Sequence, residues 1–138
     1  MPFVRIHVPQ GTAERDVRAI ADGVHAAMVA AIGVPPGDRF QVVHEHAPGR
    51  IIADPAYLGV ERSERGVFVQ ITLHAGRSDD QKRALFRAIA DRVTAGTGVR
   101  REDVLVVLTE NRSGDWSFGN GEAQVLDSGM RPHWAAPE

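Results

Sequence analysis

Pro2 is the residue of this chain whose type and position point most specifically to a chemical role. Removal of Met1 would make its nitrogen a secondary amine, and a small second residue permits that removal. An α-amino group titrates at roughly 7.7 to 8.0, and burial disfavours its charged form, so a buried Pro2 amine is a base near pH 7. When protonated, it instead polarises a carbonyl or delivers a proton. A proline that merely precedes an edge strand is the other interpretation of this position.

Two further groups have chemistry that depends on their position. Arg77 directly precedes a predicted helix, where free backbone N–H groups and the helix dipole favour an anion such as a carboxylate. His44 and His46 alternate with Glu45 on a predicted strand, and so point to one face, as a pair of metal ligands would. A third ligand at suitable spacing is missing, so we expect no metal site and no cofactor. His25 lies beside apolar residues of a predicted helix and is expected to be a packed or surface histidine.

An internal duplication indicates which elements position these groups. Residues 3–46 align without a gap on residues 68–111, and about a quarter of the aligned positions are identical. The pseudo-repeats, 2–46 and 67–111, are each predicted to form a strand, a helix and a strand. The strands are FVRIHV and FQVVHEH in the first copy, and FVQITL and VLVVLTE in the second.

The helices follow from apolar residues spaced three and four positions apart. In the second helix, Ser78 and Gln81 have the spacing of a capping box, and Gly33 and Gly98 stand where the two helices should end. The apolar positions are Val17, Ile20, Ala21, Val24, Met28 and Ile32 in the first helix, and Leu85, Phe86, Ile89 and Val93 in the second.

We therefore predict an α+β fold in which duplicated strand–helix–strand units form a four-stranded mixed sheet with both helices on one face. Each crossover makes its two strands parallel. The uncovered face is expected to be apolar and to associate with another subunit. If the first strands of the two copies pair antiparallel, Pro2 faces residues 74–77. The connection between the copies is predicted to be a loop, with residues 50–52 as a short edge strand. Residues 127–138 are predicted to be either an arm, with Trp134 as the residue that would pin it to a neighbour, or disordered.

Composition excludes several classes of protein. The 138 residues fit a single domain, 1–138, and the net charge of −2 with interspersed signs gives no reason to expect a nucleic-acid or membrane partner. There is no cysteine, which excludes disulfides and thiolate catalysis. Neither a signal peptide nor a long apolar run is present, so we expect a cytoplasmic protein.

With the duplication and Pro2 established, the chain resembles the tautomerase superfamily, most of all its malonate semialdehyde decarboxylase branch. The DWSFG run near the end is the most specific of the shared motifs. These motifs are PF at the start, HAAMVAAIGVPPGDRFQ, HAPG, LGVERS, RSDDQK and ENRSGDWSFGNGEAQVL. The resemblance implies a homotrimer, a small carboxylate substrate, and catalysis by the proline amine.

The resemblance also implies roles for individual residues. Asp38 would assist with water or adjust the charge of the proline, although Asp103 at the same place in the second repeat also fits a turn or cap residue. Arg77 matches the second carboxylate-binding arginine, but His74 stands where the first is expected. Trp116 and Phe118 would form an apolar wall around the proline; two ordinary core aromatics are the other interpretation.

A neutral histidine lacks the planar fork that holds a carboxylate, so His74 weakens the expectation of decarboxylation or hydration. Keto–enol tautomerisation of small 2-oxo or 3-oxo acids is therefore the expected activity. A decarboxylase or hydratase, and a non-catalytic binding protein of the same fold, are the alternatives.

Overall fold

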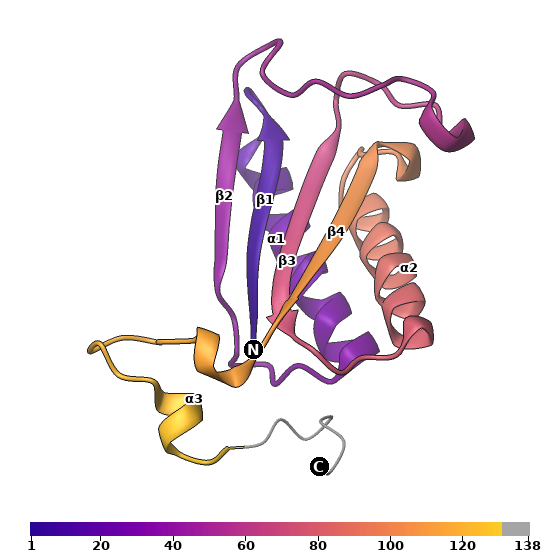
Figure 1. Ribbon diagram of the computed structural model, residues 1–138. Helices are drawn as coiled ribbons and strands as arrows, with labels where there is room; N and C mark the ends of the chain where they lie inside the picture. Colours follow the sequence, from indigo (N-terminus) through magenta and orange to yellow (C-terminus); the bar gives the residue numbers. More distant parts are fainter. Residues whose placement is uncertain (131–138) are drawn as a thin grey trace.

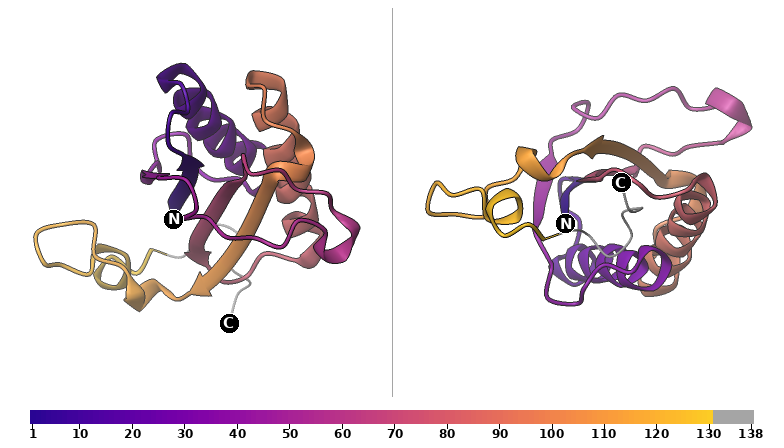
Figure 2. Two further views of the ribbon diagram at one scale, coloured as in Figure 1. Left: turned by 90° about the horizontal axis from the view of Figure 1, so that it is seen from above. Right: turned by 60° about the horizontal axis from the view of Figure 1, so that its bottom comes forward.

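The computed structural model describes residues 1–130 of the chain. Four strands form one mixed sheet in the order β2-β1-β3-β4, with two long helices on one of its faces (Figures 1 and 2). The strands are β1 (Pro2–Pro9), β2 (Gln41–His46), β3 (Val67–His74) and β4 (Val104–Asn111). The helices are α1 (Glu14–Ile32), α2 (Asp79–Gly96) and the short α3 (Gln124–Asp127), with 3-10 turns η1 (Tyr57–Gly59), η2 (Arg101–Asp103) and η3 (Ser113–Asp115). The predicted α+β fold is confirmed.

The strand pairing follows from the two crossovers. β1 pairs parallel with β2, β3 pairs parallel with β4, and the two units meet where β1 and β3 pair antiparallel. A helix between two strands of one sheet returns the chain to the same end, which makes the strands of each unit parallel. The antiparallel centre then brings the start of β1 beside the end of β3.

The core lies between the sheet and the helices, because alternate residues of the central strands and one stripe of each helix are apolar. The helix ends follow local chemistry. Gly33 ends α1 at φ 68°, and Ser78 and Gln81 form the predicted capping box of α2. The largest fully buried core side chains include Val4, Ile6, Val8, Ile20, Val24, Met28, Ile71, Leu73, Leu85 and Ile89.

α2 ends earlier than predicted, at Gly96 rather than at Gly98. The hydroxyl of Thr97 donates to the carbonyl of Val93 at 2.8 Å and accepts from the amide of Val99 at 3.1 Å. These bonds turn the chain away before Gly98 is reached.

The predicted edge strand at residues 50–52 is wrong, because this segment belongs to no strand and lies in the connection between β2 and β3. Gly49 adopts φ 77°, and the amide of Arg50 donates to the carbonyl of Ala47 at 3.1 Å. The β-branched pair Ile51 and Ile52 therefore follows a tight turn instead of extending beside a strand.

The expectation of an apolar second face also needs correction. The strand alternation leaves Phe3, Phe68 and Val107 on this face, but polar side chains stand among them. These polar residues are Arg5, His7, His44, His46, Gln70, Thr72, His74 and Thr109. Most hydrophobic residues of the strands lie at helix-facing positions. The hydrophobic character of the strands therefore did not reveal that the other face is mixed.

At the C-terminal side, α3 ends at Asp127, the first residue of the predicted arm. Residues 131–138, including Trp134, lie outside the described part of the chain. Within residues 1–130, none of the helices has the length and apolar character needed to cross a membrane.

Candidate active site

The start of β1 lies beside the end of β3, as the duplication predicted. Pro2 is the register partner of Leu73, and Phe3 that of Thr72. Figure 1 shows the N-terminus at this end of the sheet, near the arrowhead of β3. The next residues, 74–77, lead from β3 to the N-terminus of α2. The sheet therefore brings the beginning of the chain to the carboxylate-binding segment expected from sequence.

Asp38 also reaches the beginning of the chain. Its Oδ2 lies 3.0 Å from the amino nitrogen of Met1, and the two side chains are only 17% and 12% exposed. Asp38 is held by a turn in which its amide donates to the carbonyl of Pro35 at 2.9 Å. The amide of Val4 then donates to the carbonyl of Phe40 at 3.0 Å, which ties this segment to β1.

The electrostatic environment lowers the pKa of the Met1 amino group below its ordinary value of 8.0. Burial is the largest cause, because it penalises the charged form. The hydrogen bond and negative charge of Asp38 act in the opposite direction, and the positive charge of Arg77 lowers the pKa further. An amine at this end of β1 therefore loses its proton more readily than a fully exposed one.

Arg77 completes the polar part of the site. It is buried, and its Nη1 donates to the backbone carbonyl of His74 at 2.8 Å. Burial lowers the pKa of Arg77 to about 10, while the charges of Glu110 and Asp38 raise it. The guanidinium remains a cation at pH 7 and stands directly before the capped N-terminus of α2, where an anion is further favoured.

The His74 ring has a different environment. Its Nδ1 lies 2.8 Å from the carbonyl of Ala75, which can only accept, so this nitrogen carries hydrogen; its Nε2 lies 3.0 Å from the hydroxyl of Ser113. Strand alternation directs His74 to the opposite face from Leu73. The ring does not supply the bidentate grip of an arginine, and Ser113 is a partner that sequence reasoning missed.

Three aromatic rings lie in one group beside this end of the sheet. Trp116 and Phe118 stack with ring centroids 5.5 Å apart. The ring centroids of Phe118 and Phe40 are 5.3 Å apart. The indole of Trp116 donates to Oδ1 of Asn111 at 2.9 Å, which fixes it to the end of β4. Phe40 was not identified from the sequence; its place two residues after Asp38 is the signal that could have found it.

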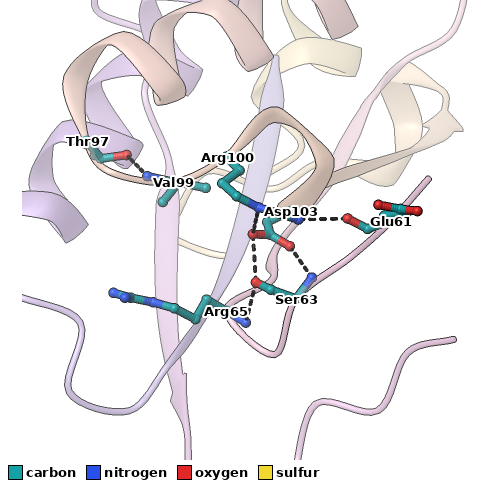
Figure 3. Close-up of polar contacts among 7 residues, drawn as sticks. All are labelled: Glu61, Ser63, Arg65, Thr97, Val99, Arg100 and Asp103. Atoms are coloured by element: carbon teal, nitrogen blue, oxygen red, sulfur yellow. Dashed lines mark hydrogen bonds and ion pairs between the residues drawn. The ribbon is translucent and has the colours of Figure 1, made fainter. Parts of the chain in front are cut away.

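Asp103, which the duplication aligns with Asp38, has a structural environment instead. Its carboxylate accepts from the amide and hydroxyl of Ser63, both at 2.7 Å, and from Nε of Arg100 at 3.1 Å (Figure 3). Burial raises the pKa of Asp103, but the bonds to Ser63 and Arg100 outweigh it and hold the pKa below its ordinary value. Arg100 also donates to the carbonyl of Glu61 at 2.7 Å, so this group anchors the connection between the repeats.

Among residues 1–130, His25 lies beside the turn that leads to Asp38, whereas His7, His44 and His46 lie further along β1 and β2. His25 is a packed residue whose Nε2 lies 2.8 Å from the carbonyl of Pro36. His44 and His46 share a face with His7, which the sequence did not single out. No group of three or more potential ligands among residues 1–130 has the arrangement of a metal site.

A cavity of about 780 Å³ lies at the other end of the sheet. It is lined by the connection between β2 and β3 together with Pro9, His46 and Phe68. Pro2, Asp38 and Arg77 do not line it. We place the candidate site by its converging charged groups and not by the size of this cavity.

Comparisons with known proteins agree with this fold. Two family models, both described as tautomerase enzymes, match residues 38–119 and 2–61. A Bacillus subtilis (strain 168) protein named "Probable tautomerase YusQ" is 41% identical over 92% of this chain and 100% of its own length. The FG41 malonate semialdehyde decarboxylase inhibited by 3-bromopropiolate superposes with a TM-score of 0.87 at 38% identity, covering 93% of this chain and 97% of that one.

A fused 4-OT, solved as a symmetric trimer, superposes with a TM-score of 0.76 at 26% identity, covering 93% of this chain and 99% of that one. The matched models and relatives span both pseudo-repeats and both sides of the candidate site. The chain therefore belongs to the tautomerase superfamily of enzymes, and to its malonate semialdehyde decarboxylase-like branch.

Proposed function

We propose that this protein catalyses keto–enol tautomerisation of small 2-oxo or 3-oxo carboxylic acids, with Pro2 as the base once Met1 is removed. The neutral amine takes the hydroxyl proton of the enol, and the oxygen electron pair re-forms the carbonyl. The carbon–carbon double bond then takes a proton from the resulting ammonium, which returns the amine to its neutral form. One proton moves from oxygen to carbon, and no cofactor is needed.

The environment of the chain's first amine is the observation that carries this proposal. Burial lowers the pKa of the Met1 amine, while Asp38 at 3.0 Å limits the decrease. After processing, the amine of Pro2 would lie in the same region, one residue further along β1. A base whose pKa lies near the working pH is effective both at accepting and at returning a proton.

Arg77 supplies the second requirement, a fixed cation for the substrate carboxylate. It is buried and held by the carbonyl of His74, so its guanidinium is already oriented before substrate binds. The aromatic group of Phe40, Trp116 and Phe118 supplies apolar surface for the rest of a small acid. Such surface also keeps an amine pKa low.

Decarboxylation or hydration of a three-carbon semialdehyde or acetylenic acid is the second candidate. The 38% identity with a malonate semialdehyde decarboxylase favours it. In that case a protonated Pro2 would polarise the carbonyl, and Asp38 would position water. His74, bonded to Ala75 and Ser113, replaces the expected first arginine and supports the simpler proton transfer.

The protein is also proposed to work as a homotrimer, as the fused 4-OT neighbour does. The two helices cover one face of the sheet and leave the other for association (Figure 2). A catalytically silent binding protein of this fold is the outcome if the amine proves unnecessary.

Turnover of phenylenolpyruvate by the protein without Met1 tests the proposal. Intact mass first establishes that Met1 is absent, because with Met1 present the Pro2 nitrogen is a tertiary amide. Pro2→Ala is expected to reduce kcat/KM by about 10²- to 10⁴-fold, the usual contribution of a positioned general base. Pro9→Ala, at the other end of β1, is the matched control and should retain activity. Unchanged turnover in Pro2→Ala would exclude the proposed base.

Heavy water separates the two candidate reactions. Proton transfer through the amine should incorporate deuterium at the carbon next to the carbonyl of a 2-oxo acid without loss of carbon dioxide. Release of carbon dioxide from malonate semialdehyde at a comparable rate would instead favour the decarboxylase.

A further inference from the structure

Glu110 stands in the same cross-strand row of the sheet as Pro2. Leu73 on β3 is the register partner of Pro2, and Glu110 on β4 is the register partner of Leu73. Directly opposite residues of neighbouring strands share a face, and Pro2 and Leu73 are both buried on the face that the helices cover. Neighbouring strands lie about 4.8 Å apart, so Glu110 stands about 10 Å from Pro2 on that same face.

An ion pair fixes Glu110 to the beginning of α2. Nζ of Lys82 lies 2.8 Å from Oε1 of Glu110. The amide of Lys82 donates to the carbonyl of Ser78 at 3.0 Å, and Ser78 is the cap residue that follows Arg77 directly. The ion pair thus joins the end of β4 to the start of α2, next to the segment that carries Arg77.

Two carboxylates act on the guanidinium of Arg77. Burial lowers the pKa of Arg77, and the negative charges of Glu110 and Asp38 raise it, Glu110 more than Asp38. Asp38 reaches the amine at the start of the chain, whereas Glu110 is held by Lys82. The carbonyl of His74 accepts from Nη1 of the same guanidinium at 2.8 Å. These attractions orient Arg77 before a substrate carboxylate arrives.

The charges of four side chains around this point cancel. Arg77 and Lys82 contribute two positive charges, and Asp38 and Glu110 contribute two negative charges. An acid with one carboxylate brings a single negative charge, with which Arg77 can pair. A second carboxylate would add another negative charge near Asp38 and Glu110, and none of the four side chains would be left to pair with it.

We propose that Glu110, held by Lys82, is a specificity-determining residue that orients Arg77 and restricts the site to acids with a single carboxylate. The inference rests on the proposed function and adds the charge of the substrate to it. Without the charge of Glu110, the four positions would carry an excess positive charge and would accept a doubly charged acid more readily. Without the charge of Lys82, they would carry an excess negative charge, and the preference for a single carboxylate would become stronger.

Two acids of equal length test the proposal: 2-oxopentanoate has one carboxylate, and 2-oxopentanedioate has two. Titration calorimetry at pH 7.5 gives the dissociation constant of each acid for the protein without Met1. The quantity compared is the dissociation constant of the doubly charged acid divided by that of the singly charged acid. Both are measured on the same sample, so a partly inactive preparation does not alter this ratio. The wild type is expected to have a ratio of at least about ten.

Substitutions of the ion pair should move the ratio in opposite directions. A unit charge at a distance of two strand spacings, about 10 Å, changes the binding of a carboxylate by about twofold in water and by about 17-fold at an effective dielectric constant of 20. Glu110→Gln should therefore lower the ratio by about fivefold, and Lys82→Met should raise it by about the same factor. The double variant restores the balance of charges and should return the ratio close to that of the wild type. Glu110→Asp keeps the charge and should change the ratio by less than about twofold.

Asp80→Asn is the matched control. Asp80 lies in the first turn of the same helix, but its side chain is 92% exposed and pairs with Arg83 at 2.8 Å. Water and salt screen such a charge, so its removal should leave the ratio nearly unchanged. A purely structural role of the ion pair predicts the same direction of change in Glu110→Gln and Lys82→Met, because both variants break the same contact.

Three results would overturn the proposal: a wild type that binds both acids equally, a ratio that moves in the same direction in both single variants, and a ratio that Glu110→Gln leaves unchanged. Exchange of the C3 protons of 2-oxopentanoate in heavy water reports the proposed function separately. Exchange without the charge preference rejects only the role of Glu110. The charge preference without exchange rejects only the catalytic proposal.

Discussion

Replacement of Asp38 by Asn should move the acidic limb of the pH–rate profile to lower pH. Asp38 lies 3.0 Å from the first amine of the chain, and its charge raises the pKa of that amine. Asparagine keeps the shape of the side chain and removes the charge. The amine of the variant therefore loses its proton at a lower pH than that of the wild type, and a neutral base is available sooner.

The magnitude follows from the separation of the charges. After removal of Met1 we take about 5 Å between the Pro2 amine and the Asp38 carboxylate; two unit charges at that distance interact by about 0.8 kcal/mol in water and about 3 kcal/mol at an effective dielectric constant of 20. One pKa unit corresponds to about 1.4 kcal/mol, so the expected shift lies between about 0.6 and 2.4 units. Because the Asp38 side chain is only 17% exposed, water screens this pair less than a surface pair, and we expect a shift toward the upper value.

The assay is kcat/KM for phenylenolpyruvate from pH 4.5 to 9, since its pH dependence reports the free enzyme. Asp103→Asn is the matched control, because it removes the aligned acid of the second repeat without touching the Pro2 site. Its acidic limb should coincide with that of the wild type. An acidic limb that stays in place in Asp38→Asn, or moves to higher pH, would refute the coupling between Asp38 and the amine.

Three other predictions concern the surrounding charges. Arg77→Lys should raise KM by about 10- to 100-fold, because lysine cannot form the two parallel hydrogen bonds of a guanidinium to a carboxylate, whereas kcat should change less. The activity of the wild type should also fall as the pH passes about 10, where Arg77 loses its proton. His74→Arg should increase carbon dioxide release from malonate semialdehyde, measured by coupled assay, if the missing arginine limits that reaction; no gain would show that another feature limits it. Asp103→Asn should reduce the free energy of unfolding in urea by about 2 kcal/mol at pH 7, because the bonds to Ser63 and Arg100 are weakened. The pKa of Asp103 is lowered in the folded state, so its carboxylate stabilises the fold above the ordinary carboxyl pKa, and this stabilisation is lost as the pH falls through the lowered value. The difference in free energy of unfolding between the wild type and Asp103→Asn should therefore be smaller at pH 3 than at pH 7.

The sequence predicted the sheet and the helices well because both follow from local periods. Alternation in β1 and β3 and three-to-four spacing in α1 and α2 identify the buried face of each element. The failed prediction at residues 50–52 shows the limit of such patterns. Two adjacent isoleucines favour a strand, but the turn at Gly49 directs them away from any partner strand.

The uncovered face shows a second limit. Its polar character depends on which residues of four strands become neighbours, and the grouping of His7, His44 and His46 appears once the register between β1 and β2 is known. A pattern along one strand does not indicate its cross-strand partners. Phe40 and Ser113 were missed for the same reason, since their contacts are with residues distant in the chain.

The amino-terminal end of β1 was predicted from sequence to face residues 74–77, because two strand–helix–strand units that meet antiparallel leave little choice. Only the tertiary structure determined which groups the two aligned acids contact. Asp38 meets the first amine of the chain, whereas Asp103 is bonded by Ser63 and Arg100. The physical reason is that the connection between β2 and β3 presents the amide and hydroxyl of Ser63 to Asp103, whereas Asp38 lies beside the start of β1 and meets an amine there.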